Sequence, residues 1–452
     1  MNEIVYPRWR WFALIAMGAA AAATIANIVA PATLIGEIAK SDGISMGAAA
    51  LATMGMLDLS TGLSGLVGGF LADRFGFGRI WLASFTMMII GALLMPIFGH
   101  TFAGLAAVRL LQGCGAGPVI ATLPMGAMRW FPPHNRGIVI GVQGTMVSVG
   151  AAGSLLFVPA VFQLTGQWTQ ALAWMAVFSG AGVLAALVMV LGPKPPVAEG
   201  APDARGGHGA LAAGELKRVL MLPATLGAMA CGFFFTWHLR SFNDMIPAFL
   251  ASDRPAGLGL GPMGAGSIMS VVQIAFMVGP LLGGLLTDKI FRGSARMLIM
   301  LGFLIASVST YALVSPVVTS NPTLLFALLL TCGLTMSITS PQVMTFVVKS
   351  HPPHVIGRLG GLLMAFNILG GLVGVGAGSY ALHVSGAYHW TIVLISLAPI
   401  GGIISAAFLV APKRIVIKPR KTTDASGINS PNPAATSMPT STPAPSPAPE
   451  PT

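Results

Sequence analysis

Apolar runs about as long as a lipid bilayer is thick recur along this chain from Trp11 to Val410, separated by short polar connections. A helix of roughly 20 apolar residues spans a hydrocarbon core. Helices are expected because hydrocarbon offers no partner for backbone amides, and these runs are too long and continuous for tilted barrel strands. Only 8% of the residues are charged, whereas a soluble domain carries about 25%. The sequence therefore predicts an all-α, multi-pass integral membrane protein.

Twelve such runs are expected to cross the bilayer, and a linker rich in Pro, Gly and charge divides them six and six. From about Thr422 the chain is mostly Pro, Ser, Thr and Ala, with too little apolar surface to offset the entropy of ordering. We expect an N-terminal six-helix bundle (1–191), a central cytoplasmic loop (192–217), a C-terminal six-helix bundle (218–412) and a disordered cytoplasmic tail (413–452). The expected spans are 11–35, 46–71, 80–98, 103–127, 138–162, 169–191, 219–243, 264–286, 296–316, 322–347, 357–382 and 390–411.

The positions of the basic residues predict the orientation of these spans. A formal charge of +11 raises the alternative of a nucleic-acid partner. With the N-terminus in the cytoplasm, however, twenty of the 24 Lys and Arg residues fall on the cytoplasmic side and only Lys40 and Arg254 fall outside. Because basic residues are enriched in cytoplasmic loops, we expect both termini in the cytoplasm, a location in the cell (inner) membrane, and no nucleic-acid partner. The first apolar run is long enough to span the bilayer, so we expect it to remain in the protein as a transmembrane helix and not to be a cleaved signal peptide.

Three short patterns recur in the same order in the two halves of the chain, at offsets of 215 to 220 residues. The matching pairs are residues 69–74 (GFLADR) with 284–289 (GLLTDK), 122–124 with 339–341, and 132–134 with 352–354. A single match of this kind is common by chance in a chain rich in Gly and Pro. The combination indicates that the two six-helix halves share one plan.

The segment after the second expected span, GFLADRFGFGR at residues 69–79, resembles the loop signature G-x-L-x-D-R-x-G-x-x-R of the major facilitator superfamily. RLLQGCG at residues 109–115 is similar to the family's R-x-x-Q-G-x-G motif, and residues 129–137 resemble its loop between spans four and five. The resemblance covers about residues 10–412. It implies twelve transmembrane helices in two pseudo-symmetric six-helix bundles, a solute site between them at mid-membrane, and alternating access by rocking.

The loop signature is expected to form a conformational latch. Asp73 and Arg74 end the second span, where the carboxylate can meet helix N-terminal amides and the Arg can bridge to a neighbouring helix. The alternative is a solvated loop whose charges only set the topology. The second copy departs from the pattern, with Phe291 where the first has Gly76. The expected latch residues are Gly69, Asp73, Arg74, Gly76, Arg79, Asp288 and Lys289.

Two ionisable residues fall deep within expected spans, where a charge is costly unless it faces a cavity or a partner. Asp58 precedes Asp73 by fifteen residues, roughly 22 Å of helix, and so lies near the midplane. We expect Asp58 to exchange a proton, with a hydrogen-bonded structural carboxyl as the alternative. Arg109 can compensate Asp58, bind an anionic solute or brace the first span. The resemblance of its surroundings to the family motif favours bracing and coupling over contact with the solute. Gln112, one turn away, can extend the same network.

The seventh expected span ends in a polar stretch, WHLRSFND at residues 237–244. Arg240 and Asp244 share one helical face, and their distance from Arg218 places them near the outer interface. An interfacial ion pair beside a belt tryptophan is the favoured interpretation. The alternative is an outer-mouth site for an anionic solute, in which His238 titrates near physiological pH. Other polar residues able to bind solute or to join helices are Asn27, Gln273, Gln342 and Asn367.

These features favour a proton-coupled secondary transporter, a symporter of a small polar or anionic metabolite. The alternatives are a proton-driven drug or metabolite efflux antiporter and a transport-inactive membrane receptor. Efflux is disfavoured because the fifth span reads GAAG at residues 150–153, where many antiporters of the family have G-x-x-x-G-P-x-x-G-G.

The chain has no phosphate-binding G-x-x-x-x-G-K-[ST] and no Ser, His and carboxylate trio within its spans. We therefore expect no enzyme, no catalytic residues, no metal and no cofactor. The expected partners are a small-molecule solute, protons and the bilayer, with the protein a monomer.

Overall fold

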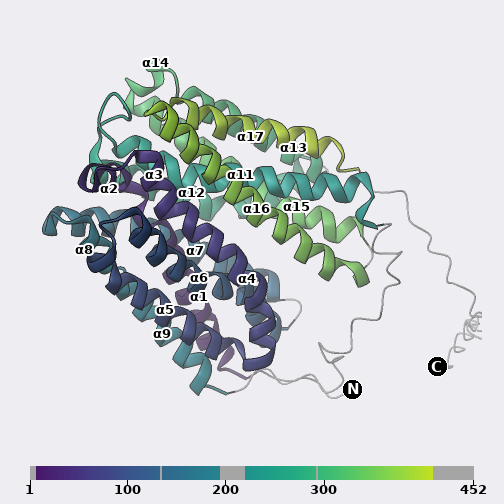
Figure 1. Ribbon diagram of the computed structural model, residues 1–452. Coiled ribbons are helices and arrows are strands. Elements are labelled where there is room, and N and C mark those ends of the chain that lie inside the picture. Colours follow the sequence, from purple (N-terminus) through teal and green to yellow (C-terminus); the bar gives the residue numbers. More distant parts are fainter. Residues whose placement is uncertain (1–6, 133–134, 194–218, 292–293, 352, 411–452) are drawn as a thin grey trace, which may run out of the picture. The chain divides into compact units, whose positions relative to one another are not determined.

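The computed structural model (Figure 1) describes residues 7–132, 135–193, 219–291, 294–351 and 353–410. Residues 194–217 of the predicted central loop and the predicted tail at 413–452 lie outside the described residues. Within the described residues the regular structure is helical. The predicted bundle boundaries at 191 and 218 stay predictions.

The first half of the chain forms the helices that correspond to the first six expected spans. Two of these spans contain irregular turns: the 3₁₀ segment η1 ends the first span, and the π-helical turn η2 interrupts the second. The helices are α1 (Arg10–Val29), η1 (Ala30–Thr33), α2 (Ile35–Asp42), α3 (Met46–Ala50), η2 (Leu51–Gly55), α4 (Met56–Phe75), α5 (Phe77–Phe98), α6 (Phe102–Trp130), α7 (Arg136–Thr165), α8 (Trp168–Ala173) and α9 (Ala176–Leu191).

The second half forms the helices of the last six spans, with one short extra helix, α14. Eleven helical segments of the described chain are long and apolar enough to cross a membrane. The twelfth is α11, whose 29 residues include the polar stretch at 237–244. The predicted all-α fold with twelve transmembrane helices is confirmed. The helices are α11 (Pro223–Ala251), α12 (Gly261–Lys289), α13 (Ala295–Ala312), α14 (Pro316–Thr319), α15 (Pro322–Ser350), α16 (Pro353–Ser385) and α17 (His389–Ala407).

The two halves use the same helix pairings, which confirms the pseudo-symmetry inferred from the sequence repeats. In the first half, α1 packs against α7 and α9, while α6 packs against α4 and α5. In the second half, α11 packs against α16 and α17, while α15 packs against α12 and α13. Each pairing joins helices at the same positions in the order of spans, so each half is one six-helix bundle.

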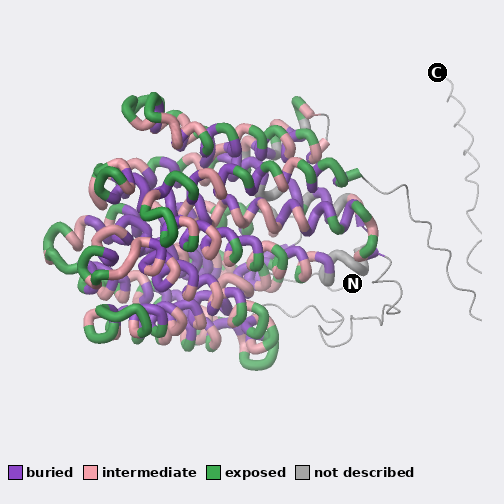
Figure 2. Tube along the Cα trace, turned by 45° about the horizontal axis from the view of Figure 1, so that its top comes forward, coloured by how far each residue is buried: buried purple, intermediate pink, exposed green. Residues whose placement is uncertain are grey.

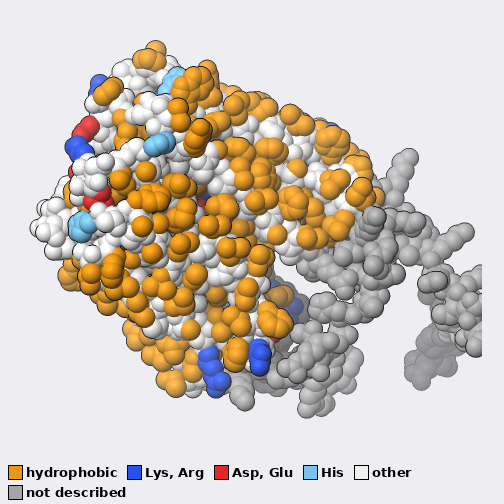
Figure 3. All heavy atoms as spheres, in the orientation of Figure 1, with side chains coloured by type: hydrophobic (Ala, Val, Ile, Leu, Met, Phe, Trp, Pro, Cys, Tyr) orange, Lys and Arg blue, Asp and Glu red, His pale blue; other side chains and the backbone are white. Residues whose placement is uncertain are grey.

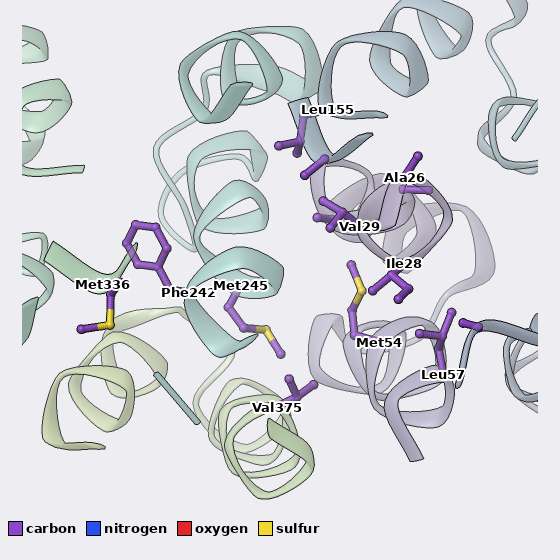
Figure 4. Packing of buried hydrophobic residues seen from close by; sticks show 14 of the residues in the cluster. Ala26, Ile28, Val29, Met54, Leu57, Leu155, Phe242, Met245, Met336 and Val375 are labelled. Carbon is purple, nitrogen blue, oxygen red and sulfur yellow. The ribbon is translucent and has the colours of Figure 1, made fainter. Parts of the chain in front are cut away.

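The flanks of the protein are apolar, as a lipid-facing surface requires. Figure 3 shows hydrophobic side chains spread along the helices and charged side chains gathered toward the ends. Ile15, Phe70 and Leu164 are 70%, 72% and 86% exposed. The buried residues follow the inner faces of the helices (Figure 2), where Met54 and Ile28 of the first half approach Met245 and Val375 of the second (Figure 4).

Two helix pairings between the halves involve close backbone approach. Helix α7 packs along α12, where a Cβ at Gly266 would overlap the backbone carbonyl of Leu155. Helices α3 and α4 pack along α16, where a Cβ at Gly47 would overlap the backbone of Ser379. Glycine at these positions lets the backbones approach closely, as is typical of membrane helix interfaces.

The bundle has two distinguishable ends. We call the end at which α1 begins and α17 finishes the termini end, and the opposite end, with α2, α3 and α14, the far end (Figure 1). At the far end the halves are joined by polar contacts: Lys40 Nζ donates to Asp253 Oδ2 at 2.7 Å, and Ser45 Oγ lies 2.6 Å from His383 Nδ1. The hydrogen bond to Asp253 raises the pKa of Lys40, so its ammonium stays charged at physiological pH.

Gly150 tests the packing of α7 against α1. A Cβ there would overlap the backbone of Ala22, whereas a Cβ at Gly180 meets nothing within 4 Å. We expect Gly150→Ala to lower the free energy of unfolding by about 1–3 kcal/mol through overpacking. Gly180→Ala, the matched control, should raise it by up to about 1 kcal/mol through helix propensity. Thermal unfolding of both variants in detergent measures the difference, and equal midpoints would contradict the packing.

Candidate functional site

A cavity of about 480 Å³ lies between the two halves. Its walls come from α1, α4 and α6 on one side and from α11 and α16 on the other. Along α4 the lining runs from Asp58 through Gly62 to Leu66, and that helix runs from the far end toward the termini end. The cavity therefore starts near the middle of the bundle and extends toward the termini end.

An ion pair that joins the two halves lies at the inner limit of this cavity. Arg240 of α11 binds Asp58 of α4 through two parallel contacts: Nε donates to Oδ2 at 3.1 Å, and a terminal nitrogen donates to Oδ1. The side chains of Arg240 and Asp58 are 20% and 9% exposed. Bidentate pairing of this kind is strong and fixes geometry. Among the residues that line the cavity, Asp58 and Arg240 are the charged ones.

A second carboxylate shares Arg240. Asp244 follows one turn later on α11, with Oδ2 3.5 Å from a terminal nitrogen of Arg240. Asp244 is completely buried, and neither of its oxygens has a hydrogen-bond partner among the described residues. A buried carboxylate without hydrogen bonds is costly, and Arg240 is the charged residue that Asp244 contacts.

Arg109 is buried beside Asp58, Arg240 and Asp244 and donates hydrogen bonds mainly to backbone carbonyls. Its guanidinium donates to the carbonyls of Asn27 (3.1 Å), Ile28 (3.1 Å) and Thr53 (2.6 Å) and to Gln112 Oε1 (2.7 Å). Pro31 has no N–H to donate to the carbonyl of Asn27 four residues earlier, and Arg109 supplies the missing donor.

The carbonyl of Thr53 lies in the π-helical turn η2, where regular helical bonding is interrupted. Arg109 thus joins the last turn of α1, just before η1, to the π-helical turn η2. It is only 1% exposed and does not line the cavity.

Most of the other polar residues singled out in the sequence form hydrogen bonds within or between helices instead of lining the cavity. Asn27 donates to Ala23 of its own helix, Gln273 donates to Asn243, and Gln342 accepts from Thr287. His238 is buried inside the second half, with Nδ1 3.0 Å from the Ile395 carbonyl and Nε2 3.4 Å from Cys332 Sγ. Of the predicted residues, the cavity is lined by Asp58, Arg240 and Asn367.

The predicted depth of Arg240 and Asp244 was wrong. They were placed near the outer interface because the polar stretch at 237–244 was taken as the end of the seventh span. Helix α11 continues to Ala251. Asp244 is completely buried, and Arg240, whose side chain is 20% exposed, lines the central cavity. A polar stretch marks the end of a transmembrane helix only when water solvates it. Here the polar side chains are partnered by protein groups, including Asp58 of the other half.

The loop signature makes contacts within the first half. Asp73 Oδ1 lies 2.9 Å from a terminal nitrogen of Arg129, where helix N-terminal amides were expected. The guanidinium of Arg74 lies over the ring of Phe75. Gly76 has φ +85° and turns the chain directly from α4 into α5, a conformation that favours glycine.

The remaining predicted latch residues lie near the same end of the bundle. Gly69 lies in α4 and Arg79 in α5, while Lys289 is exposed at the end of α12. The side chain of Asp288 lies outside the described residues. Latch function stays a prediction.

Sequence analysis missed the uncharged walls of the cavity. Thr61, Gly62 and Gly65 lie three, four and seven residues after Asp58, on the same face of α4. Thr236 precedes Arg240 by four residues on α11 in the same way. The sequence therefore did contain a signal for the cavity walls, namely the residues that share a helical face with Asp58 or Arg240. The apolar residues on such a face cannot be distinguished from lipid-facing residues without the tertiary structure.

Comparison with known proteins shows which family and which relatives this chain resembles. The family model described as Major Facilitator Superfamily matches residues 12–375 and 245–444. The 3-(3-hydroxy-phenyl)propionate transporter of Escherichia coli (strain K12) is 29% identical over 254 residues, 55% of this chain and 58% of that protein. The match thus spans little more than half of that relative. The probable galactarate/D-glucarate transporter of Bacillus subtilis (strain 168) is 23% identical over 397 residues, 78% of this chain and 82% of that protein.

Among solved structures, a bacterial homolog of the human lysosomal transporter Spinster, in an inward-facing and unoccupied conformation, superimposes with a TM-score of 0.70. The superposition covers 90% of this chain and 97% of that one at 16% sequence identity, so the likeness is one of fold.

Replacing Arg109 tests its bracing role. An ammonium cannot reach the three carbonyls that the guanidinium binds, so Arg109→Lys should lower the free energy of unfolding by about 2–4 kcal/mol. Arg136 is the matched control, because it also donates to two backbone carbonyls, those of Phe131 and Met128, but is less buried. Thermal unfolding in detergent should show a much smaller loss for Arg136→Lys. Equal losses would contradict the role given to Arg109.

Proposed function

The chain belongs to the Major Facilitator Superfamily, and from this membership we propose that it is a secondary active transporter that carries a small anionic metabolite together with protons, by alternating access of its central cavity. The observation that carries the proposal is Arg240, the cation that lines this cavity and is held by Asp58 from the opposite half. A guanidinium is well suited to carboxylate recognition because it donates two parallel hydrogen bonds.

The relatives support an anionic solute. Both named relatives are described as transporters of carboxylates: a hydroxyphenylpropionate in one case and galactarate or D-glucarate in the other. In this protein Arg240 is bound to Asp58 and close to Asp244. A solute carboxylate would compete with Asp58 for the same guanidinium, because both groups offer two oxygens in the same geometry.

The balance of buried charge supports coupling to protons. Arg109 and Arg240 carry two positive formal charges, and Asp58 and Asp244 carry two negative ones, so this group is neutral before solute enters. An added anion would leave one uncompensated charge in a poorly solvated interior, which is costly. A proton that arrives with the anion restores neutrality. Asp58 is the expected acceptor because it lines the cavity, whereas Asp244 is completely buried.

The ends of the bundle fit one state of an alternating-access cycle. The far end is closed by Lys40 with Asp253 and by Ser45 with His383, while the cavity extends toward the termini end. With basic residues concentrated at the termini end, the positive-inside rule makes that end cytoplasmic. In this state the cavity would face the cytoplasm, and uptake would follow the inward proton gradient.

Asp58→Asn tests the coupling step. We expect uptake driven by a pH gradient into proteoliposomes to fall at least tenfold, because an amide cannot take up and release the proton. Exchange of labelled for unlabelled solute without a gradient should persist. Radiolabelled 3-phenylpropionate and glucarate serve as solutes. Glu37→Gln, a change of an acidic residue at the far end that does not line the cavity, is the matched control. Unchanged gradient-driven uptake in Asp58→Asn would remove Asp58 from the coupling mechanism.

A disulfide at the far end tests alternating access. In a variant whose three native cysteines are replaced, Ser45→Cys with His383→Cys should form a cross-link under oxidation, because the native side chains are in contact. Transport should then fall at least fivefold and return on reduction, since the far end must open in each cycle. The two single-cysteine variants are the controls. Full transport by the cross-linked protein would contradict alternating access through this end.

A further inference from the structure

Resting on the proposed function, we infer that the solute is a monocarboxylate with an apolar body, aromatic or branched aliphatic, and not a dicarboxylate or a polyhydroxylated acid. The carboxylate binds Arg240 at the inner limit of the cavity, and the body lies along the apolar walls toward the termini end. Three features of the cavity carry this inference: its single accessible cation, its shortage of hydrogen-bonding groups and the nature of its walls.

The number of accessible cations limits the solute to one carboxylate. Arg240 is the cation among the described residues that line the cavity. Arg109 is nearby but is 1% exposed, and its donors are committed to three backbone carbonyls and Gln112. A second carboxylate on the solute would therefore lie against the walls without a positive partner, which is strongly unfavourable in a poorly solvated cavity.

The cavity offers few hydrogen-bonding groups to a polyhydroxylated body. Besides the ion pair, its polar lining residues are Thr61, Thr236 and Asn367. The hydroxyl of Thr236 already donates to the carbonyl of Gly232 at 3.0 Å. The hydroxyl oxygen of Thr61 has no partner among the described residues but is itself buried. The hydroxyls of a sugar acid would mostly lose water without gaining a partner, and each such loss opposes binding.

The walls favour an apolar body. Ile25, Ile28 and Ile120 line the cavity from the first half, and Phe235 and Met364 line it from the second. Contact with an apolar body removes this surface from water. An aromatic body gains more, because the ring of Phe235 and the thioether of Met364 both make favourable contacts with aromatic rings.

In this proposal, proton uptake and solute binding are linked at the ion pair. A proton from the aqueous side binds the carboxylate of Asp58, which turns an acceptor of two hydrogen bonds into a neutral acid. Arg240 is then free to donate both hydrogen bonds to the solute carboxylate. No covalent bond to the solute forms or breaks, and the loaded cavity keeps the formal charge of the empty one.

Binding of four probes to the purified protein in nanodiscs tests the solute class. Isothermal titration compares 3-phenylpropionate, its uncharged amide 3-phenylpropanamide, the polyol monocarboxylate gluconate and the polyol dicarboxylate glucarate. We expect 3-phenylpropionate to bind at least tenfold more tightly than each of the other three. Tighter binding of gluconate or glucarate would overturn the apolar-body inference and leave anion transport standing. Equal binding of the acid and its amide would overturn the inference and the proposed function together.

Variants on the two parts of the site make the test specific. Arg240→Gln should remove the preference for the acid over the amide, whereas Arg136→Gln, outside the cavity, should keep it. Met364→Ala should weaken binding of 3-phenylpropionate threefold or more. Its matched control is Met344→Ala, at a methionine of similar exposure that does not line the cavity. Equal effects of the two methionine changes would overturn the assignment of the apolar wall. The methionine pair and the four probes decide the question even if Arg240→Gln fails to fold.

Discussion

The arrangement of charges at the centre of this protein depends on one guanidinium held between two carboxylates in an apolar interior. Arg240 pairs with Asp58 across the two halves and stands beside Asp244 on its own helix. Each charge would be costly alone, and the three persist because they lie together and because a fourth, Arg109, balances the sum. The same arrangement makes the site responsive, because a proton or an anion that enters the group changes which carboxylate Arg240 binds.

The helices around this group are shaped to hold it. Pro31 ends α1 in a 3₁₀ turn and leaves the carbonyl of Asn27 without its helical partner, and Arg109 fills that vacancy. The π-helical turn η2 presents the carbonyl of Thr53 to the same side chain. Breaks in regular helix are tolerated at membrane depth only where protein groups satisfy the freed backbone. Arg109 thus satisfies backbone carbonyls at the end of α1 and in η2.

The two ends of the bundle differ in a way that connects packing to transport. At the far end, a glycine at position 47 lets α3 approach α16 closely, and exposed polar contacts close over it. Exposed pairs such as Lys40 with Asp253 contribute little to stability and separate easily. Toward the other end the halves part around a cavity with apolar walls. The far end is closed by weak, exposed contacts, while the stronger Asp58–Arg240 pair lies at the centre. This arrangement is suited to reversible opening of the far end.

The number of spans, the fold and its internal symmetry can be predicted from the amino-acid sequence, because hydrocarbon requires long apolar helices and because repeats survive in short motifs. The sequence also identified Asp58 and Arg109 as deep charges and the link between Arg109 and Gln112, since rise per residue and helical spacing are local properties. Only the tertiary structure decided which charges meet. Asp58 and Arg240 are 182 residues apart in the chain, and their contact depends on how α4 and α11 rotate and approach. That rotation is set by close packing summed over many helices, which no local pattern encodes.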